Sequence, residues 1–182
     1  MRKIIHTVDA ISEWTAKTGR WFIPLLMVLV TFEVTMRYVF TRPTLWGYEL
    51  HVMIAASTYV LAFAYTHLHR AHVRVDMIYA HLPLRVQALI DFLGTLLLFF
   101  PFIFLLSYVA WEYMFKAWAT SEKMAITGWY PPAAPLRTMV LYGLCLFALQ
   151  AIAHFFRDSY QMIKGKPYDP EYISADKGQA YD

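Results

Sequence analysis

The sequence predicts an all-α integral membrane protein with four transmembrane helices, and three observations lead to this fold class. Of the 182 residues, 59% are hydrophobic and the mean hydropathy is +0.40, whereas a soluble domain is roughly 45–50% apolar. The apolar residues gather in four runs, at about 21–40, 45–66, 86–115 and 136–156. Each run is near or above the roughly 20 residues that a helix needs to cross a bilayer. We therefore expect one four-helix membrane domain over 21–164.

Residues 1–20 precede the first run and are amphipathic. The apolar positions recur at helical spacing: Ile4, Val8, Ile11 and Trp14. This pattern favours a helix that lies in the membrane interface and leads into the first span, over an ordinary solvated turn. Residues 165–182 are polar and contain two prolines, so we expect a cytoplasmic tail there.

Prolines mark the connections and the third span. The short turn around Pro43 makes the first two spans antiparallel neighbours. The third span is longer than one crossing needs, and Pro101 near its middle removes a backbone hydrogen bond, which predicts a kink. Pro83 suits the start of this helix. The loop over 119–135 holds three prolines and should be irregular but stiff.

The distribution of Lys and Arg predicts the orientation in the membrane. Eleven basic residues lie in the N-terminal segment, in the 67–85 loop and after the fourth span, whereas four lie on the other side. Cytoplasmic segments carry the excess of Lys and Arg. We therefore expect a multi-pass protein with both termini in the cytoplasm.

Three charged residues fall inside or at the edge of the first two spans. Glu33 and Arg37 are four residues apart, so they share one helix face. Arg37 and Glu49 are each six residues from Pro43, which gives them equal depth in an antiparallel hairpin. A compensated cluster is what intramembrane charges ordinarily need, so the pattern favours a structural ion cluster over an ion or proton site.

The fourth span has a face suited to contact with other helices. Its members share one side of the helix: Gly143, Phe147, Gln150 and His154. A small residue allows close approach, and Gln150 can hydrogen-bond across helices.

The histidines raise the questions of metal and haem. Several cluster in the basic loop: His67, His69, His72 and His81. Zinc needs three or four ligands in fixed geometry, whereas basic residues facing anionic lipid headgroups explain the same loop more simply. We expect no metal and no cofactor. The alternative is a haem-binding membrane cytochrome b-type redox subunit, in which His67 and His154 would form the one axial pair.

Other functional classes lack support in the sequence. Residue patterns typical of soluble enzymes, such as a P-loop, GxSxG, CxxC or HExxH, do not occur. The net charge of +3 is dispersed, which gives no nucleic-acid patch. We therefore expect neither an enzyme nor a nucleic-acid-binding protein.

The order of several short motifs resembles one family of transporter subunits. RYVF at 37–40 is followed by the Pro43 turn, WGYEL at 46–50, and then AYTHLHRAHVRVDMIYAHLP at 64–83. This order resembles the small permease subunit of tripartite ATP-independent periplasmic (TRAP) transporters, the DctQ-like family. The most specific motif residues lie in the loop before the third span: His72, Arg74, Asp76, Pro83 and Arg85.

The resemblance implies a non-catalytic subunit of a sodium-coupled uptake system for organic acids in the bacterial inner membrane. Such a subunit scaffolds the large permease (M) subunit and helps to dock the periplasmic substrate-binding protein. Candidate docking residues lie in the two outer loops: Arg42, Trp46, Lys123, Trp129 and Tyr130. Trp, Tyr and Arg are usual interface anchors. The alternative for the aromatics, above all for Trp46, is that they anchor the helices among the lipid headgroups.

Overall fold

The computed structural model describes residues 2–69 and 82–164, and its named elements are all helices. They follow in the order α1 (Arg2–Gly19), α2 (Phe22–Tyr38), α3 (Gly47–Leu68), α5 (Leu84–Gly94), the π-helical turn η1 (Thr95–Phe99), α6 (Phe100–Thr120) and α7 (Ala134–Lys164). The all-helical fold class predicted from the sequence is confirmed. The motif residues His72, Arg74 and Asp76 and the expected tail at 165–182 lie outside the described residues.

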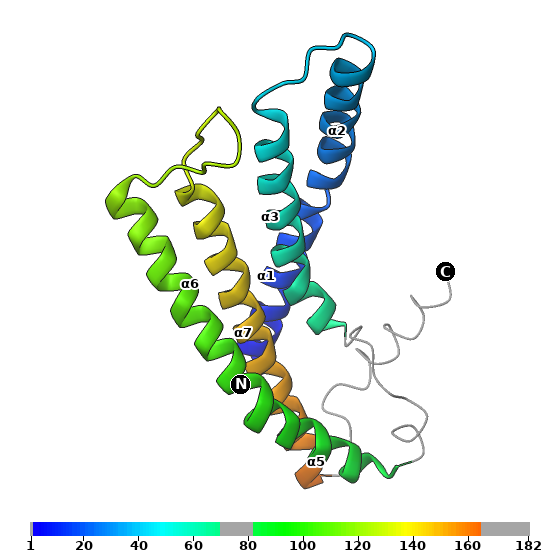
Figure 1. Cartoon of the computed structure of the whole chain (residues 1–182). Coiled ribbons are helices and arrows are strands. Elements are labelled where there is room, and N and C mark those ends of the chain that lie inside the picture. Colours follow the sequence, from blue (N-terminus) through cyan, green and yellow to red (C-terminus); the bar gives the residue numbers. More distant parts are fainter. Residues whose placement is uncertain (1, 70–81, 165–182) are drawn as a thin grey trace.

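The helices form a bundle with two distinct ends (Figure 1). The α2–α3 and α6–α7 loops lie at one end, which we call the outer end. The start of α1, α5 and the end of α7 lie at the other, the inner end. The central helices α3 and α7 share the most extensive contact, α5 and α6 pack on α7, α2 packs on α3, and α1 packs on both α3 and α7.

The seam between α3 and α7 is tight because one of its residues has no side chain. A Cβ at Gly143 would overlap the backbone of Val60, so the two helices approach more closely than any larger residue allows. Small and branched apolar residues of both helices are buried, including Ala64, Leu144 and Ala151. Farther along the same face of α7, Gln150 and His154 are also buried, as expected for the contact face of the fourth span.

Three stretches within the described residues are long and apolar enough to cross a membrane: Ile5–Tyr38, Leu89–Thr120 and Ala134–Lys164. The expected second span, α3, is not one of them. α3 carries Glu49 and Ser57, both buried, on a helix that lies at the centre of the bundle. A central helix can carry polar side chains because its neighbours shield them from lipid. The count of four spans stays a prediction.

The third expected span is one continuous helical path with a π-helical turn in it. The amide of Phe100 donates to the carbonyl of Thr95, five residues back, and Pro101 follows directly at the start of α6. Proline has no N–H and its ring crowds the carbonyl four residues back. A π-helical turn is one of the local adjustments that accommodate such a residue within a membrane helix. The kink expected at Pro101 stays a prediction.

Helix α1 exposes apolar side chains such as Trp14 and turns several polar side chains toward the bundle. Trp14 is 68% exposed, whereas Ser12 is fully buried and Asp9 is buried. Contact between this segment and the membrane interface stays a prediction. The face that carries Asp9 and Ser12 is covered by α3 and α7, so the polar residues on it need hydrogen-bond partners inside the protein.

Candidate functional site

The α6–α7 loop at the outer end is folded back on itself. Ser121 adopts a left-handed conformation (φ 49°) that ends α6 and reverses the chain. The amide of Met124 then donates to the carbonyl of Pro131 (2.8 Å), and the amide of Ala133 donates to the carbonyl of Glu122 (2.9 Å). The loop over 121–133 is therefore a narrow, hydrogen-bonded structure, in keeping with the stiffness expected from its prolines.

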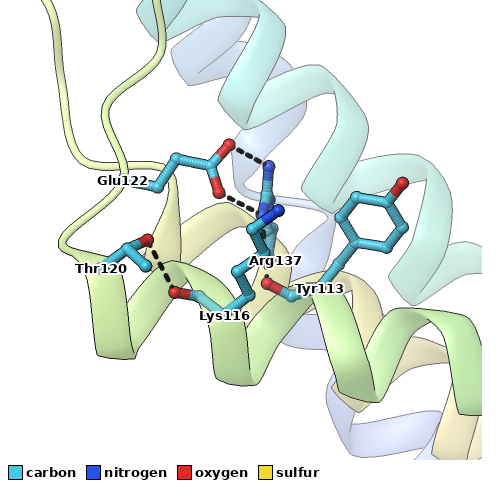
Figure 2. Close-up of polar contacts among 5 residues, drawn as sticks. All are labelled: Tyr113, Lys116, Thr120, Glu122 and Arg137. Carbon is cyan, nitrogen blue, oxygen red and sulfur yellow. Dashed lines mark hydrogen bonds and ion pairs between the residues drawn. The ribbon is translucent and has the colours of Figure 1, made fainter.

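An ion pair holds the base of this loop (Figure 2). Arg137, in the first turns of α7, donates to both carboxylate oxygens of Glu122 at 2.6 Å each. The same guanidinium donates to the carbonyl of Tyr113 at 3.1 Å and lies 5.2 Å from the centre of the Tyr113 ring. Two parallel charge-assisted bonds fix the orientation of both groups. Arg137 thus joins the loop, the end of α6 and the start of α7.

A second contact holds the tip of the loop. The amide of Thr127 donates to Glu49 Oε1 at 2.7 Å, and the Glu49 side chain is fully buried. Gly128, next along the loop, lies beside Leu45 of the α2–α3 loop. Loops 39–46 and 121–133 therefore meet at the outer end and form one surface, which we call the outer platform.

The candidate docking residues are all exposed on the outer platform. Arg42 and Lys123 present their charges to solvent, and Trp129 and Tyr130 are 44% and 54% exposed. Trp46 differs, because its ring stacks on Phe32 of α2 with 5.9 Å between ring centres. This stacking favours the helix-anchoring alternative for Trp46. Their role in docking stays a prediction.

The expected cluster of Glu33, Arg37 and Glu49 is not formed. Arg37 pairs with Glu33 at 3.1 Å, and within the described residues no ion pair joins Arg37 to Glu49. The other oxygen of Glu33 accepts a hydrogen bond from Thr44, in the α2–α3 loop just before α3. Equal distance from the turn sets equal depth but not direction, and Glu49 faces the α6–α7 loop instead.

The inner end holds a buried polar network that the sequence interpretation missed. Gln150 of α7 donates to Asp9 Oδ1 (2.9 Å) and accepts from Ser12 (3.1 Å), both on α1. Arg157 of α7 pairs with the other oxygen of Asp9. The detectable signal was polar residues at helical spacing, Asp9, Ser12 and Thr15, on the side of α1 opposite Trp14.

The histidine geometry does not suit haem. The imidazoles of His67 and His154 lie edge to face with ring centres 4.9 Å apart. Phe99 stacks on His67 and Phe147 packs against it, with ring centres 5.4 and 5.2 Å away. Axial haem ligands approach the iron from opposite faces of a planar macrocycle, and no macrocycle fits between two rings in contact. In the described part of the chain no three His, Cys, Asp or Glu side chains are grouped to hold a metal ion.

Two motif residues of the basic loop lie within the described ranges. Pro83 caps the start of α5, and its carbonyl accepts the amides of Val86 (2.8 Å) and Gln87 (3.1 Å). The helix thus begins just after the expected proline. Arg85 lies in the first turn of α5.

A comparison with known protein families decides between a transporter subunit and a haem-binding redox subunit. The family model described as tripartite ATP-independent periplasmic transporters, DctQ component, matches residues 26–160. The chain belongs to this family. The match runs from within α2 to within α7 and leaves α1 outside it. The resemblance inferred from the sequence motifs is confirmed, and this DctQ component is a membrane subunit of a TRAP transporter. A search of curated proteins found no match.

Proposed function

We propose that this DctQ component is the non-catalytic small permease subunit of a sodium-coupled, binding-protein-dependent uptake system for organic acids in the bacterial inner membrane. Its partners are the large permease (M) subunit, a periplasmic substrate-binding protein and membrane lipids. The observation that carries the proposal is the family match across 26–160. The chain scaffolds the large subunit and offers the outer platform to the binding protein.

The proposed topology has four spans, with α3 as the second. About 20 residues, the length of one crossing, counted inward from the outer ends of α2, α3, α6 and α7 reach Gly19, Thr66, Pro101 and Ala153. The boundary drawn through these residues leaves the Asp9–Arg157 pair on the cytoplasmic side, where buried charges are less costly than in hydrocarbon. The excess of basic residues at the inner end supports the same orientation.

The bundle has the properties of a scaffold. The α3–α7 seam is close-packed around Gly143, and ion pairs hold helices together at both ends. The outer faces of α2 and α6 remain open, since α2 has no buried residue and α6 has two, Ile103 and Ala117. Such apolar faces suit contact with lipid or with helices of the large subunit.

Docking of the binding protein is supported by the form of the outer platform. Its loop is hydrogen-bonded to itself, to α7 through Arg137 and to α3 through Glu49. A surface that is already ordered loses less entropy on binding. Arg42 and Lys123 supply charge for steering, and Trp129 and Tyr130 supply aromatic contact area.

The test is uptake into vesicles that contain both membrane subunits. We expect Arg42→Glu and Lys123→Glu to slow uptake several-fold when the binding protein is limiting, and much less when it is in excess, because concentration offsets weak docking. Trp129→Ala should act in the same direction. Lys164→Glu makes the same charge change at the inner end and should leave uptake at the wild-type rate.

Co-purification with the large subunit controls for assembly in every variant. Unchanged uptake at limiting binding protein in both outer charge reversals and in Trp129→Ala would remove the platform from the docking surface. Loss of co-purification in these variants would instead assign the platform to contact with the large subunit.

Orientation is tested separately by labelling single cysteines in a Cys145→Ser background. Ala125 lies exposed in the outer loop and Glu13 lies exposed on α1. An impermeant thiol reagent added to spheroplasts should modify Ala125→Cys and spare Glu13→Cys until the membrane is opened. The reverse pattern would overturn the orientation, and with it the docking role.

A further inference from the structure

A pocket of about 320 Å³ lies where α1 joins α2, against the inner part of α3. α1 ends at Gly19 and α2 begins at Phe22, and the joint between them contains a tighter turn in which the amide of Trp21 donates to the carbonyl of Thr18 (3.2 Å). The helix axis changes direction at this joint, and this change leaves space beside α3. Within the described residues, no side chain fills this space.

The pocket is lined mainly by apolar surface, together with two basic residues. Ile23, Leu61 and Ala62 supply apolar lining, and Lys17 and Arg20 also line the pocket, from around the end of α1. Lys17 pairs with Glu13 at 2.7 Å on the surface of α1. In the described part of the chain no carboxylate pairs with Arg20, whose guanidinium lies 6.0 Å from the Trp21 ring. One cation that lines the pocket is therefore uncompensated.

The basic residues of the pocket are level with the membrane boundary, if the boundary is placed by helix length. About 20 residues from the outer end of α2 reach Gly19, and the same count along α3 reaches Thr66. Arg20 and Tyr65, both lining the pocket, lie beside these positions. Trp21 is 67% exposed, and tryptophan is enriched at the membrane–water interface. The apolar lining residues Ile23, Leu61 and Ala62 then lie on the hydrocarbon side of the boundary.

We propose that this pocket binds one anionic phospholipid of the cytoplasmic leaflet. The headgroup phosphate pairs with Arg20, with Lys17 nearby, and one acyl chain lies along Ile23, Leu61 and Ala62. The basic residues match the negative charge of the headgroup, and the apolar lining matches the acyl chain. The bound lipid fills the space between the α1–α2 joint and α3, and so holds α1 in place. This role is independent of docking and of the transported substrate.

The test is lipid binding to the full-length chain in detergent, measured by native mass spectrometry. The probes are phosphatidylglycerol and phosphatidylcholine with identical acyl chains, and inorganic phosphate as competitor. We expect the anionic lipid to bind at least fivefold more tightly than the zwitterionic one. Arg20→Gln should abolish that preference, since one basic residue near a headgroup contributes about fivefold in affinity. Lys164→Gln removes a charge on the same side of the membrane and should keep the preference.

A second variant tests the acyl-chain part of the pocket. Ala62 is exposed to the pocket, so Ala62→Phe fills it without changing any charge. We expect weaker binding of both lipids in this variant. Equal binding of the two lipids to the wild type, a preference that survives Arg20→Gln, unchanged binding in Ala62→Phe, or displacement of the lipid by inorganic phosphate would each overturn the proposal.

Discussion

The two ends of the bundle are both held by an arginine–carboxylate pair from α7, but in different surroundings. At the outer end, Arg137 and Glu122 keep 24% and 35% of their side-chain surface exposed. At the inner end, Arg157 and Asp9 keep 10% and 12%. The outer pair orders a loop, whereas the inner pair joins two helices that are more than 140 residues apart in sequence.

The difference shows which pair contributes more to stability. An exposed pair gains little, because water already solvates both ions. A buried pair is costly to form, and removing one partner leaves a charge without its counter-ion in a poorly solvated place. We therefore expect the inner pair to matter for the integrity of the fold and the outer pair to matter for the order of the platform.

The largest effect is expected from Asp9→Asn. The change keeps the shape of the side chain but removes the charge that faces Arg157 and alters the acceptor of Gln150. We expect a loss of about 3 kcal/mol, at the lower end of the range for a broken buried pair. The measurement is the midpoint of unfolding in detergent. Glu13→Gln, in the exposed pair with Lys17 on the same helix, should cost under about 0.5 kcal/mol. Equal midpoints in the two variants would refute the distinction between buried and exposed ion pairs.

The next effect concerns the seam that connects the two ends. In Gly143→Ala the new methyl group meets the backbone of Val60, so α3 and α7 must move apart. We expect a loss of about 1–3 kcal/mol, as is usual for overpacking. Gly94→Ala is the matched control, because nothing lies within 4 Å of its added Cβ. There the loss of freedom in the unfolded chain should raise stability by about 0.4–1 kcal/mol. A Gly143→Ala variant as stable as Gly94→Ala would contradict the close seam.

The helices and the contact face of α7 could be predicted from the sequence, but the partners of that face could not. Apolar runs of membrane length mark a helix directly, and Gly143, Gln150 and His154 share one side by spacing alone. Nothing in that spacing says that Asp9 and Ser12 supply the hydrogen bonds to Gln150. That pairing depends on how α1 lies across the bundle, which is a tertiary property.

The partners of Glu49 at the outer end likewise could not be predicted from the sequence. The sequence argument placed Glu49 at the depth of Arg37 and so expected a contact between them. Depth follows from counting residues along a hairpin, whereas direction depends on the rotation of α3 about its axis. The buried Glu49 turns to the amide of Thr127, a contact that only a folded α6–α7 loop can offer.

A smaller effect is expected at the base of that loop. Glu122→Gln weakens both bonds to Arg137, and the partial exposure of the pair limits the cost to about 1 kcal/mol. The amides of Met124 and Ala133 should exchange with deuterium roughly fivefold faster, which corresponds to that free energy. Lys123→Gln changes the neighbouring charge without touching Arg137 and serves as control. Unchanged exchange in Glu122→Gln would show that the hydrogen bonds within the loop suffice to order it.

The smallest effect is expected at Arg37, whose side chain is 52% exposed. Arg37→Ala removes the pair with Glu33, but Glu33 keeps its hydrogen bond from Thr44, so the carboxylate is still held beside the start of α3. We expect a loss of under about 1 kcal/mol, seen as a lower yield than that of Arg42→Ala in the exposed turn. The loss should remain well below that of Asp9→Asn, because the pair at the outer end of α2 is the less buried of the two. Equal yields of Arg37→Ala and Arg42→Ala would mean that Thr44 alone holds Glu33. A loss as large as that of Asp9→Asn would mean instead that Arg37 lies in a far less solvated place than its exposure indicates.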